Sequence, residues 1–467
     1  MLKDSVIKRL EEIVGKENVK TSKEELLTYS YDATVPEFMP DAVVFPETAE
    51  EISRILKLAN AEKFSVVPRG AGTNLSGGVL PLEGGVVLST ARMNRILEID
   101  TDNLVAVVQP GVITAELDAA VGEHGLFYPP DPASGTVSTL GGNIAECSGG
   151  PRCLKYGVTR DYVLGLQVVL PTGEIVRTGG RTVKNTTGYD FTRLFIGSEG
   201  TIGIVTEITV RLLPKPEAKK TMLAIYDDVV DASQTVSAII AHGIIPTTLE
   251  LMDNLLIQCA EDYTHAGLPK DAGALLLIEV DGFRESLDRQ VGTILELCEK
   301  NNAKEVRMAK DEKEVAILWK ARKTVIGAVA RVRPSYSLQD ITVPRNRLPD
   351  IVARIVEISK KYDLPIGVLA HAGDGNLHPL VMFDKRKEEE VERVHAAEEE
   401  MCRAALEMGG TLTGEHGVGY VKRTFLTWAY SKDELEMTRR LKEFFDPNGI
   451  LNPGKIVKWD ASRGEQE

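Results

Sequence analysis

The chain has 467 residues, of which 43% are hydrophobic and 27% charged, as is typical of a globular protein with two or three domains. Its 69 acidic and 55 basic side chains give a net charge of −14, which argues against nucleic acid or an anionic membrane as the main partner. The five cysteines form no C-x-x-C pair, so neither an iron–sulfur cluster nor a structural zinc site of the usual spacing is expected. Residues 1–20 predict a charged amphipathic helix rather than a signal peptide, and no apolar run reaches membrane-spanning length. We therefore expect a soluble, cytoplasmic protein.

Residues 1–40 predict short helices and a connector, and a β-α-β unit follows them. Its strands are predicted over 42–45 and 64–67. Between them, Thr48 followed three residues later by a glutamate is the pattern of a helix N-terminus, and the helix is predicted to run to Lys63. No internal repeat is visible.

A glycine-rich loop, residues 68–78, follows the second of these strands. Glycine lets the backbone approach a ligand closely, and successive N–H groups in such a loop can surround an anion. Thr73, Asn74 and Ser76 add hydrogen-bonding side chains. The loop suits a phosphate or pyrophosphate, although a tight turn between strands explains a single such loop equally well. It lacks the third glycine and the following helix of the dinucleotide-binding fingerprint.

Two more glycine-rich tracts follow, at residues 130–143 and 197–204. Three such loops between short strands of one domain are hard to explain as turns alone. An extended, phosphate-bearing cofactor lying across several loop ends explains them together.

These tracts carry a family resemblance. PRGAGTNLSGG, GTVSTLGGNIAECSGG and GSEGTIGIVTE resemble the FAD-binding domain of the vanillyl-alcohol oxidase superfamily, in particular the branch of bacterial glycolate oxidase catalytic subunits and D-lactate dehydrogenases. The resemblance covers about residue 20 to residue 458. It implies an α+β fold, with a two-subdomain FAD-binding domain, a ferredoxin-like substrate cap and a C-terminal segment that returns to the FAD domain.

The resemblance also implies which residues contact the cofactor. They belong to the three glycine-rich tracts and to the C-terminal segment. They are Pro68, Arg69, Gly70, Ala71, Gly72, Thr73, Asn74, Ser76, Pro130, Asp131, Ser134, Thr136, Gly141, Gly142, Asn143, Ala145, Glu199, Gly200, Ile202, Gly203, Ile204 and Asn452. Several relatives attach FAD through a histidine, but none of the seven histidines falls within 68–78, so we expect non-covalent FAD.

A linker rich in proline and charge, residues 214–217, separates this FAD-binding domain (41–213) from a second domain. Beyond it the pattern over 222–308 predicts the element order β-α-β-β-α-β, which is ferredoxin-like. We expect the second domain to span 217–440 and the closing segment 441–467 to pack on the FAD domain.

Two short motifs in the second half contain three of the seven histidines. His371 and His378 flank a glycine-bent loop between two apolar runs, and Glu415-His416 lies between glycines. Two imidazoles and a carboxylate are the ligands of an open divalent-metal site, but hydrogen-bonded loop histidines explain the pattern equally well.

In the relatives, the matching positions ligate a divalent metal, and the histidine after the glutamate is the catalytic base. This implies His371, His378 and Glu415 as ligands of zinc, iron or manganese, with His416 as base. Asn376 would hold the loop or contact substrate, and Asp374 would shape the turn.

The helix predicted over 312–332 contains several basic side chains, most of which fit a solvated face. A carboxylate substrate calls for a forked donor, which arginine supplies and lysine does not. Arg322, after a tryptophan, matches the carboxylate-binding arginine of the relatives. Relatives that act on long dicarboxylates have a lysine where this chain has Leu338, so a small monocarboxylate is expected.

The sequence thus predicts an FAD- and metal-dependent dehydrogenase of a small D-2-hydroxy acid, with D-lactate favoured. Electrons would pass to a partner protein in an oligomeric complex, either an electron-transferring flavoprotein or an iron–sulfur subunit. The alternatives are a glycolate oxidase catalytic subunit that uses iron–sulfur subunits or quinone, a non-oxidative flavoenzyme of the same fold such as an ether-lipid synthase, and a non-catalytic relay subunit.

Overall fold

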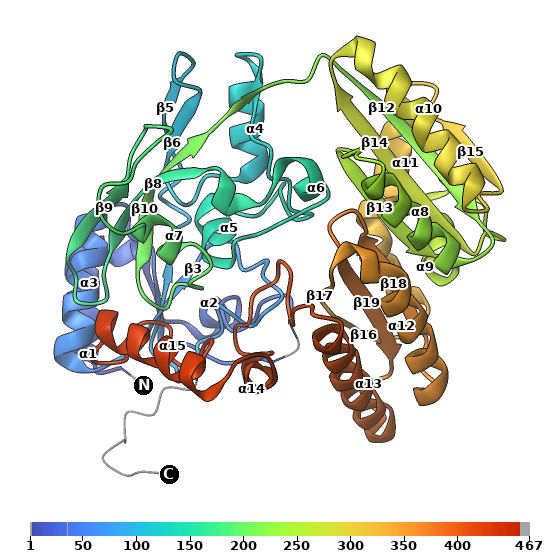
Figure 1. Cartoon of the computed structure of the whole chain (residues 1–467). Helices are drawn as coiled ribbons and strands as arrows, with labels where there is room; N and C mark the ends of the chain where they lie inside the picture. The colour runs from blue at the N-terminus through green and yellow to red at the C-terminus, as the bar shows by residue number, and fades with distance from the viewer. Residues whose placement is uncertain (1, 35, 458–467) are drawn as a thin grey trace. The chain divides into compact units, whose positions relative to one another are not determined.

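The computed structural model describes residues 2–34 and 36–457, and the chain divides into two compact units (Figure 1). The first unit comprises Met1–Gly149, Val158–Lys215 and Glu415–Glu467, and the second comprises Gly150–Gly157 and Pro216–Gly414. No helix among the described residues is long and apolar enough to cross a membrane.

A four-stranded sheet in the first unit contains the predicted β-α-β unit. The strands β2 (Ala42–Val44), β4 (Val86–Ser89) and β3 (Val66–Arg69) are parallel, and β1 (Val19–Lys20) pairs antiparallel with β2. Helix α3 (Ala49–Glu62) connects β2 to β3, and the Glu51 N–H donates to Thr48 Oγ1 at 3.1 Å, so the predicted N-cap is confirmed. One face of α3 packs with α1 (Asp4–Val14) in the core of this subdomain.

The second sheet of this unit is antiparallel, in the order β5-β6-β10-β8-β9. Its strands are β5 (Ile96–Asp100), β6 (Val105–Val108), β10 (Ile204–Arg211), β8 (Val163–Val169) and β9 (Ile175–Gly179). A small pair, β7 (Leu126–Phe127) with β11 (Leu213–Pro214), and the helices α2 (Lys23–Leu27), α4 (Thr114–Gly122), α5 (Leu140–Glu146) and α7 (Phe191–Phe195) complete these two subdomains.

The C-terminal segment belongs to the first unit from residue 415 onward. Its helices are α14 (Leu426–Ala429) and α15 (Lys432–Phe445), and the chain then pairs with β3, where Val66 N–H donates to Ile450 O at 2.8 Å. The domain expected over 217–440 therefore differs from the second unit, which ends at Gly414. The reason is that α15 is tied to the first unit, since buried Lys442 Nζ donates to Thr201 O at 2.7 Å.

The second unit is built on one large antiparallel sheet, in the order β15-β12-β14-β13-β18-β19-β16, with β17 also pairing with β19 (Figure 1). Its strands are β12 (Ala218–Tyr226), β13 (Thr248–Asp253), β14 (Ala274–Gly282), β15 (Glu305–Met308), β16 (Ser335–Leu338), β17 (Ile341–Thr342), β18 (Ile366–His371) and β19 (Asn376–Phe383). Its helices are α6 (Cys153–Tyr156), α8 (Val229–Ala241), α9 (Asn254–Thr264), α10 (Arg284–Lys300), α11 (Glu312–Ala328), α12 (Leu348–Tyr362) and α13 (Glu388–Glu407).

The predicted ferredoxin-like arrangement forms one half of this sheet. The first four strands lie in the order β15-β12-β14-β13, which is the ferredoxin-like order of fourth, first, third and second strand. In the other half, β19 pairs with β18, β16 and β17, and Thr342 of β17 bridges Thr411 after α13. The sheet therefore continues beyond the predicted ferredoxin-like strands, because β18 pairs with β13.

Helices cover both faces of the sheet. On one face, α9 and α11 pack against alternate strand residues such as Leu275, Leu277 and Leu380. The intervening residues Leu276 and Ile278 are fully buried and point to the opposite face, where α8 packs beside α10 and α12. The face covered by α9 and α11 carries the side chains of the candidate site described below.

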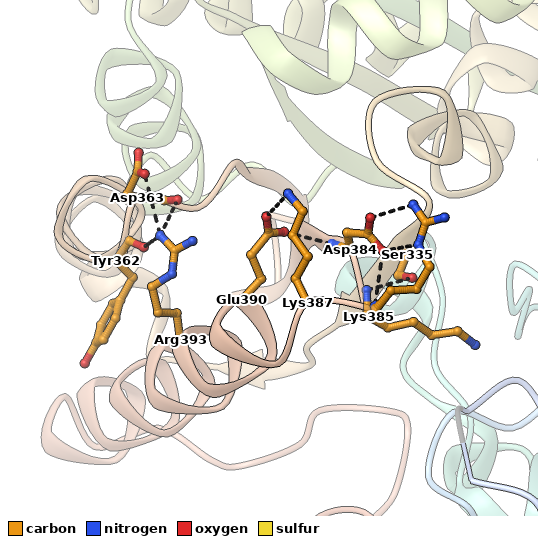
Figure 2. Close-up of polar contacts among 9 residues, drawn as sticks. Ser335, Tyr362, Asp363, Asp384, Lys385, Lys387, Glu390 and Arg393 are labelled. Carbon is orange, nitrogen blue, oxygen red and sulfur yellow. Dashed lines mark hydrogen bonds and ion pairs between the residues drawn. The ribbon is translucent and has the colours of Figure 1, made fainter.

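Polar contacts connect α13 to the C-terminal ends of α12 and β19 (Figure 2). Arg393 Nη1 donates to the carbonyl oxygens of Tyr362 and Asp363, at 2.9 and 3.1 Å, just where α12 ends. Asp384 N–H donates to Glu390 Oε2 at 2.9 Å, which ties the first turn of α13 to the end of β19. The Arg393 bonds satisfy carbonyl groups that the end of α12 leaves open, and the Asp384 bond joins a strand end to a helix, so the role of these contacts is structural.

Candidate active site

A cavity in the first unit is lined by the three glycine-rich tracts. Sixteen of the predicted cofactor residues line it: Pro68, Arg69, Gly70, Ala71, Gly72, Thr73, Asn74, Ser134, Gly141, Gly142, Asn143, Ala145, Glu199, Gly200, Gly203 and Ile204. Glu415 and His416 line the same cavity, which brings the predicted base to the predicted cofactor site.

Six predicted cofactor residues do not line this cavity: Ser76, Pro130, Asp131, Thr136, Ile202 and Asn452. Two of them hold the loops together. Asn452 Nδ2 donates to Gly78 O at 2.9 Å and to Glu199 O at 2.7 Å, and Ser76 Oγ donates to Glu146 Oε1 at 3.0 Å. Both residues therefore hydrogen-bond to residues that line the cavity without lining it themselves.

Gly70 allows two of the glycine-rich tracts to pack closely at the cavity. A Cβ at Gly70 would lie 2.3 Å from Thr139 Oγ1, the side chain that caps α5. We therefore expect Gly70→Ala to weaken FAD binding by about tenfold, because overpacking typically costs about 1–3 kcal/mol. A fluorescence titration of apoprotein with FAD would measure the change. Gly180→Ala is the matched control, since a Cβ there meets nothing within 4 Å, and an equal loss in both variants would contradict this prediction.

The loop that carries Glu415 and His416 is anchored within the first unit. The Val418 and Gly419 N–H groups donate to the two carboxylate oxygens of Glu199, at 2.7 and 2.6 Å. Ser76 O accepts from the Tyr420 N–H at 2.9 Å. Glu199, predicted to contact FAD, thus holds the loop of the predicted base as well as lining the cavity.

Glu146 and Glu199 form a buried pair of carboxyl groups beside this loop. One Glu146 oxygen and one Glu199 oxygen would both lie within 3.0 Å of a Cβ built at Gly417. Burial raises the pKa of Glu199 to about 7. Burial, and then the charge of Glu199, raise the pKa of Glu146 well above its ordinary value.

This pair predicts a pH dependence of stability. The folded protein binds the proton of Glu146 more tightly than the unfolded chain does, so its contribution is present below pH 4.5 and is lost as the pH rises through the folded-state pKa. We expect the melting temperature of Glu146→Gln apoprotein to rise relative to wild type as the pH rises above 4.5 and through the folded-state pKa of Glu146. A constant difference across this range would contradict the assignment, and exposed Glu116→Gln is the control.

In the second unit, His371 and His378 lie together on neighbouring strands. His371 ends β18, His378 lies near the start of β19, and the register pairs Leu369 with His378. Both imidazoles therefore point to one face of the sheet, and their ring centroids are 5.0 Å apart. The turn between them requires Gly375, whose φ is +82° and where a Cβ would lie 2.2 Å from Val343 O.

Arg322 of α11 reaches the same face and pairs with a carboxylate there. Arg322 Nη2 lies 2.5 Å from Glu250 Oε2, and Glu250 Oε1 lies 2.8 Å from His371 Nδ1. Burial alone would raise the pKa of Glu250, but Arg322, then His371 and His378, outweigh it and hold the pKa below its ordinary value. The carboxylate is therefore ionised between two positively polarised groups.

Asp340 is a second buried carboxylate in this cluster. It accepts from Asn376 Nδ2 at 2.6 Å, from Thr413 Oγ1 at 2.5 Å and from the Gly414 N–H at 2.8 Å. Asn376 Nδ2 also lies 3.1 Å from Thr342 Oγ1, so this amide nitrogen is engaged within the fold. The structure thus favours the loop-holding role for Asn376, and its substrate contact stays a prediction.

Sequence reasoning assigned no role in the site to Glu250 or Asp340. Glu250 is 1% exposed and Asp340 is fully buried. One signal was available, since Glu250 interrupts an apolar strand, and a buried charge is costly unless it is paired.

Two family models match the chain. The model described as "FAD binding domain" matches residues 40–179, and the model described as "FAD linked oxidases, C-terminal domain" matches residues 215–456. Among solved structures, p-cresol methylhydroxylase with substrate bound has a TM-score of 0.80 at 18% identity, covering 97% of each chain. An alkyldihydroxyacetonephosphate synthase has a TM-score of 0.73 at 21% identity, covering 97% of this chain and 85% of that chain. At such identities the structures show the fold alone.

Curated relatives are more similar in sequence. Glycolate oxidase subunit GlcD of Bacillus subtilis (strain 168) is 51% identical, covering 99% of this chain and 99% of the relative. GlcD of Escherichia coli (strain K12) is 41% identical over 97% and 91% of the two chains, and D-lactate dehydrogenase of Anaerostipes hadrus is 35% identical over 89% of each.

The matches define an FAD-linked oxidoreductase, and its fold is of the vanillyl-alcohol oxidase type. The chain belongs to the FAD-linked oxidases, with glycolate oxidase and D-lactate dehydrogenase chains among its relatives. The expected fold class, the expected family and FAD-linked oxidation of hydroxy acids are confirmed.

Proposed function

We propose that this chain oxidises a small 2-hydroxy monocarboxylate with non-covalent FAD and one divalent metal ion. One observation carries the proposal, namely that Arg322, His371 and His378 gather on one face of the second sheet although they come from three separate elements. A guanidinium and two imidazoles suit an anionic, oxygen-rich ligand and a cation that binds it.

Arg322 would bind the substrate carboxylate. Its side chain is 7% exposed, and its Nε has no hydrogen-bond acceptor among the described residues. A buried guanidinium with a spare donor is costly unless a ligand completes it. A carboxylate would do so with the planar, two-point geometry that arginine favours.

His371, His378 and Glu415 would hold the metal. His371 Nδ1 is engaged by Glu250, which leaves Nε2 as its ligand atom. Such an ion would polarise the substrate oxygens and lower the pKa of the hydroxyl. Zinc, iron(II) and manganese all suit two imidazoles and a carboxylate.

His416 would take the hydroxyl proton onto a ring nitrogen, from its place in the cavity of the first unit. When bound, FAD would accept the hydride from the substrate Cα. The residues of the cavity then have to hold the cofactor and keep the site dry. The 415–419 loop has to keep the base in place.

The substrate would be short. Leu338 pairs with Leu380 on the face that carries His378, and both belong to an apolar cluster. A second carboxylate at this position would meet leucine rather than a cation. D-lactate is the substrate expected from sequence, and glycolate is the second candidate because two relatives are named as glycolate oxidase subunits.

The electrons would leave through a partner protein in a complex. GlcD is named as a subunit in both relatives, which supports a multi-chain enzyme. An electron-transferring flavoprotein and an iron–sulfur subunit are the two candidate acceptors.

Anaerobic reduction of the purified protein tests the substrate. D-lactate, L-lactate, glycolate and D-2-hydroxyglutarate would be added separately, and the oxidised-flavin absorbance would be followed. Bleaching by D-lactate or glycolate supports the proposal and distinguishes its two forms. Bleaching by D-2-hydroxyglutarate alone would overturn the role of Leu338. A flavin that none of the acids reduces, in a preparation with bound metal, would favour the ether-synthase or relay alternatives.

Arg322→Lys tests the carboxylate clamp. Lysine keeps the positive charge but cannot make the two parallel hydrogen bonds of a guanidinium to a carboxylate. Because a hydrogen bond to a charged group is worth about 1.5–3 kcal/mol, we expect KM to rise about 10- to 100-fold. Steady-state kinetics with an artificial electron acceptor would measure the change. Exposed Arg331→Lys is the control, and an unchanged KM in Arg322→Lys would contradict the clamp.

A further inference from the structure

We propose that Glu250 is a positioning residue that sets the geometry of both Arg322 and His371, and so couples substrate binding to metal binding. The inference rests on the proposed function of these two residues. It adds a buried carboxylate that contacts neither the proposed substrate nor the metal in that scheme.

The strand register places Glu250 between its two partners. Glu250 of β13 pairs directly with His371 of β18, so the two side chains stand side by side on the same face of the sheet. That face is covered by α11, which brings Arg322 to the same carboxylate. One carboxylate therefore contacts a residue of the adjoining strand and a residue of the covering helix.

The two partners share the carboxylate. His371 Nδ1 lies 2.8 Å from Oε1 and 3.0 Å from Oε2, and a carboxylate that is ion-paired with Arg322 accepts from it, so Nδ1 carries the proton and Nε2 keeps its lone pair. Oε2 also lies 2.5 Å from Arg322 Nη2, which pairs the guanidinium with the same carboxylate. Both the tautomer of the ligand and the direction of the substrate clamp depend on one side chain.

The burial of the group makes this dependence strong. Glu250 is 1% exposed and Arg322 6%, so water cannot replace either partner without opening the core. Removing the negative charge would leave the buried guanidinium without its counter-charge and His371 without a fixed tautomer. Metal affinity and substrate affinity should therefore fall together.

Glu250→Gln in the FAD-loaded protein tests the proposal. Glutamine has the shape of glutamate but no charge, and its NH2 group can face Arg322 or His371 unfavourably. After removal of bound metal, Mn²⁺ and Zn²⁺ affinities would be measured by competition with a chromophoric chelator, and KM and kcat by steady-state kinetics. We expect metal affinity to fall about 10- to 100-fold, the usual range for groups that orient metal ligands, and KM to rise by about tenfold or more.

Glu279→Gln is the matched control. Glu279 lies on β14 of the same sheet, is 7% exposed, and accepts from Thr221 Oγ1 at 2.9 Å and from Trp319 Nε1 of α11 at 3.4 Å. We expect this variant to keep wild-type metal affinity and KM. Equal losses in both variants would show a general structural effect and overturn the proposal.

Glu250→Asp covers the case in which Glu250→Gln does not fold. Aspartate keeps the negative charge that the buried Arg322 needs. Its side chain is one methylene shorter, so it cannot reach both Arg322 and His371 at the distances seen here. We expect a folded protein with weakened metal binding. Wild-type metal affinity and KM in either Glu250 variant would overturn the positioning role, whereas a wild type that binds no metal would overturn the proposed function itself.

Discussion

His378→Ala should produce a yellow protein that retains FAD but binds no divalent metal and does not turn over. The imidazole comes from the second unit, whereas the residues that line the cofactor cavity all belong to the first, so flavin content should not change. Three protein ligands are the usual minimum for an open catalytic metal site, and two would hold the ion far more weakly. Metal analysis by mass spectrometry, flavin absorbance and anaerobic flavin reduction would measure the three quantities on one sample.

His395→Ala is the matched control for this substitution. His395 lies on α13 of the same unit with its side chain 71% exposed, next to Glu398. Its loss should change neither metal content nor turnover. Full activity in His378→Ala would contradict the ligand assignment, and loss of FAD together with metal would point to misfolding rather than to a missing ligand.

Replacement of His416 with glutamine should slow substrate-dependent flavin reduction by about 10²- to 10⁴-fold, the range typical of a lost general base. Glutamine can keep a hydrogen bond but cannot take up a proton. The anchoring bonds of the loop come from the N–H groups of Val418 and Gly419, so the loop should keep its conformation. Anaerobic stopped-flow spectroscopy would measure the reduction rate, while FAD and metal contents should match wild type.

His124→Gln provides the comparison, because His124 is an exposed histidine of the same unit that does not line the cavity. A wild-type rate in His416→Gln would reject the base assignment. A rate restored at high pH would instead indicate that solvent hydroxide can replace the base, which supports the assignment.

Local patterns predicted the parts of the structure that depend on neighbouring residues. The helix Ala49–Glu62 and its N-cap at Thr48 concern groups only a few residues apart, whose hydrogen bonds are decided by the chain next to them. The hairpin that brings His371 and His378 together is equally local, because a glycine-bent turn between two apolar strands determines which strands pair. Likewise, the ferredoxin-like element order follows from alternating patterns along the chain.

Local patterns could not predict contacts between residues that are far apart in the sequence. No feature of sequence spacing links Glu250 to Arg322 and His371, since the three residues meet only after β13 and β18 pair and α11 covers them. The assignment of the 415–419 loop to the first unit likewise depends on Glu199, more than two hundred residues away.

The sequence by itself determined the family and the kind of cofactor, and it predicted the candidate site residues, because these depend on short motifs of glycine, histidine and glutamate. Only the tertiary structure decided which buried carboxylates hold those motifs in place. The physical reason is that a buried charge is stable only beside its partners, and sheet register and helix packing, rather than sequence distance, choose those partners. Glu250, Asp340 and Glu199 are three buried carboxylates of this chain whose partners come from distant segments.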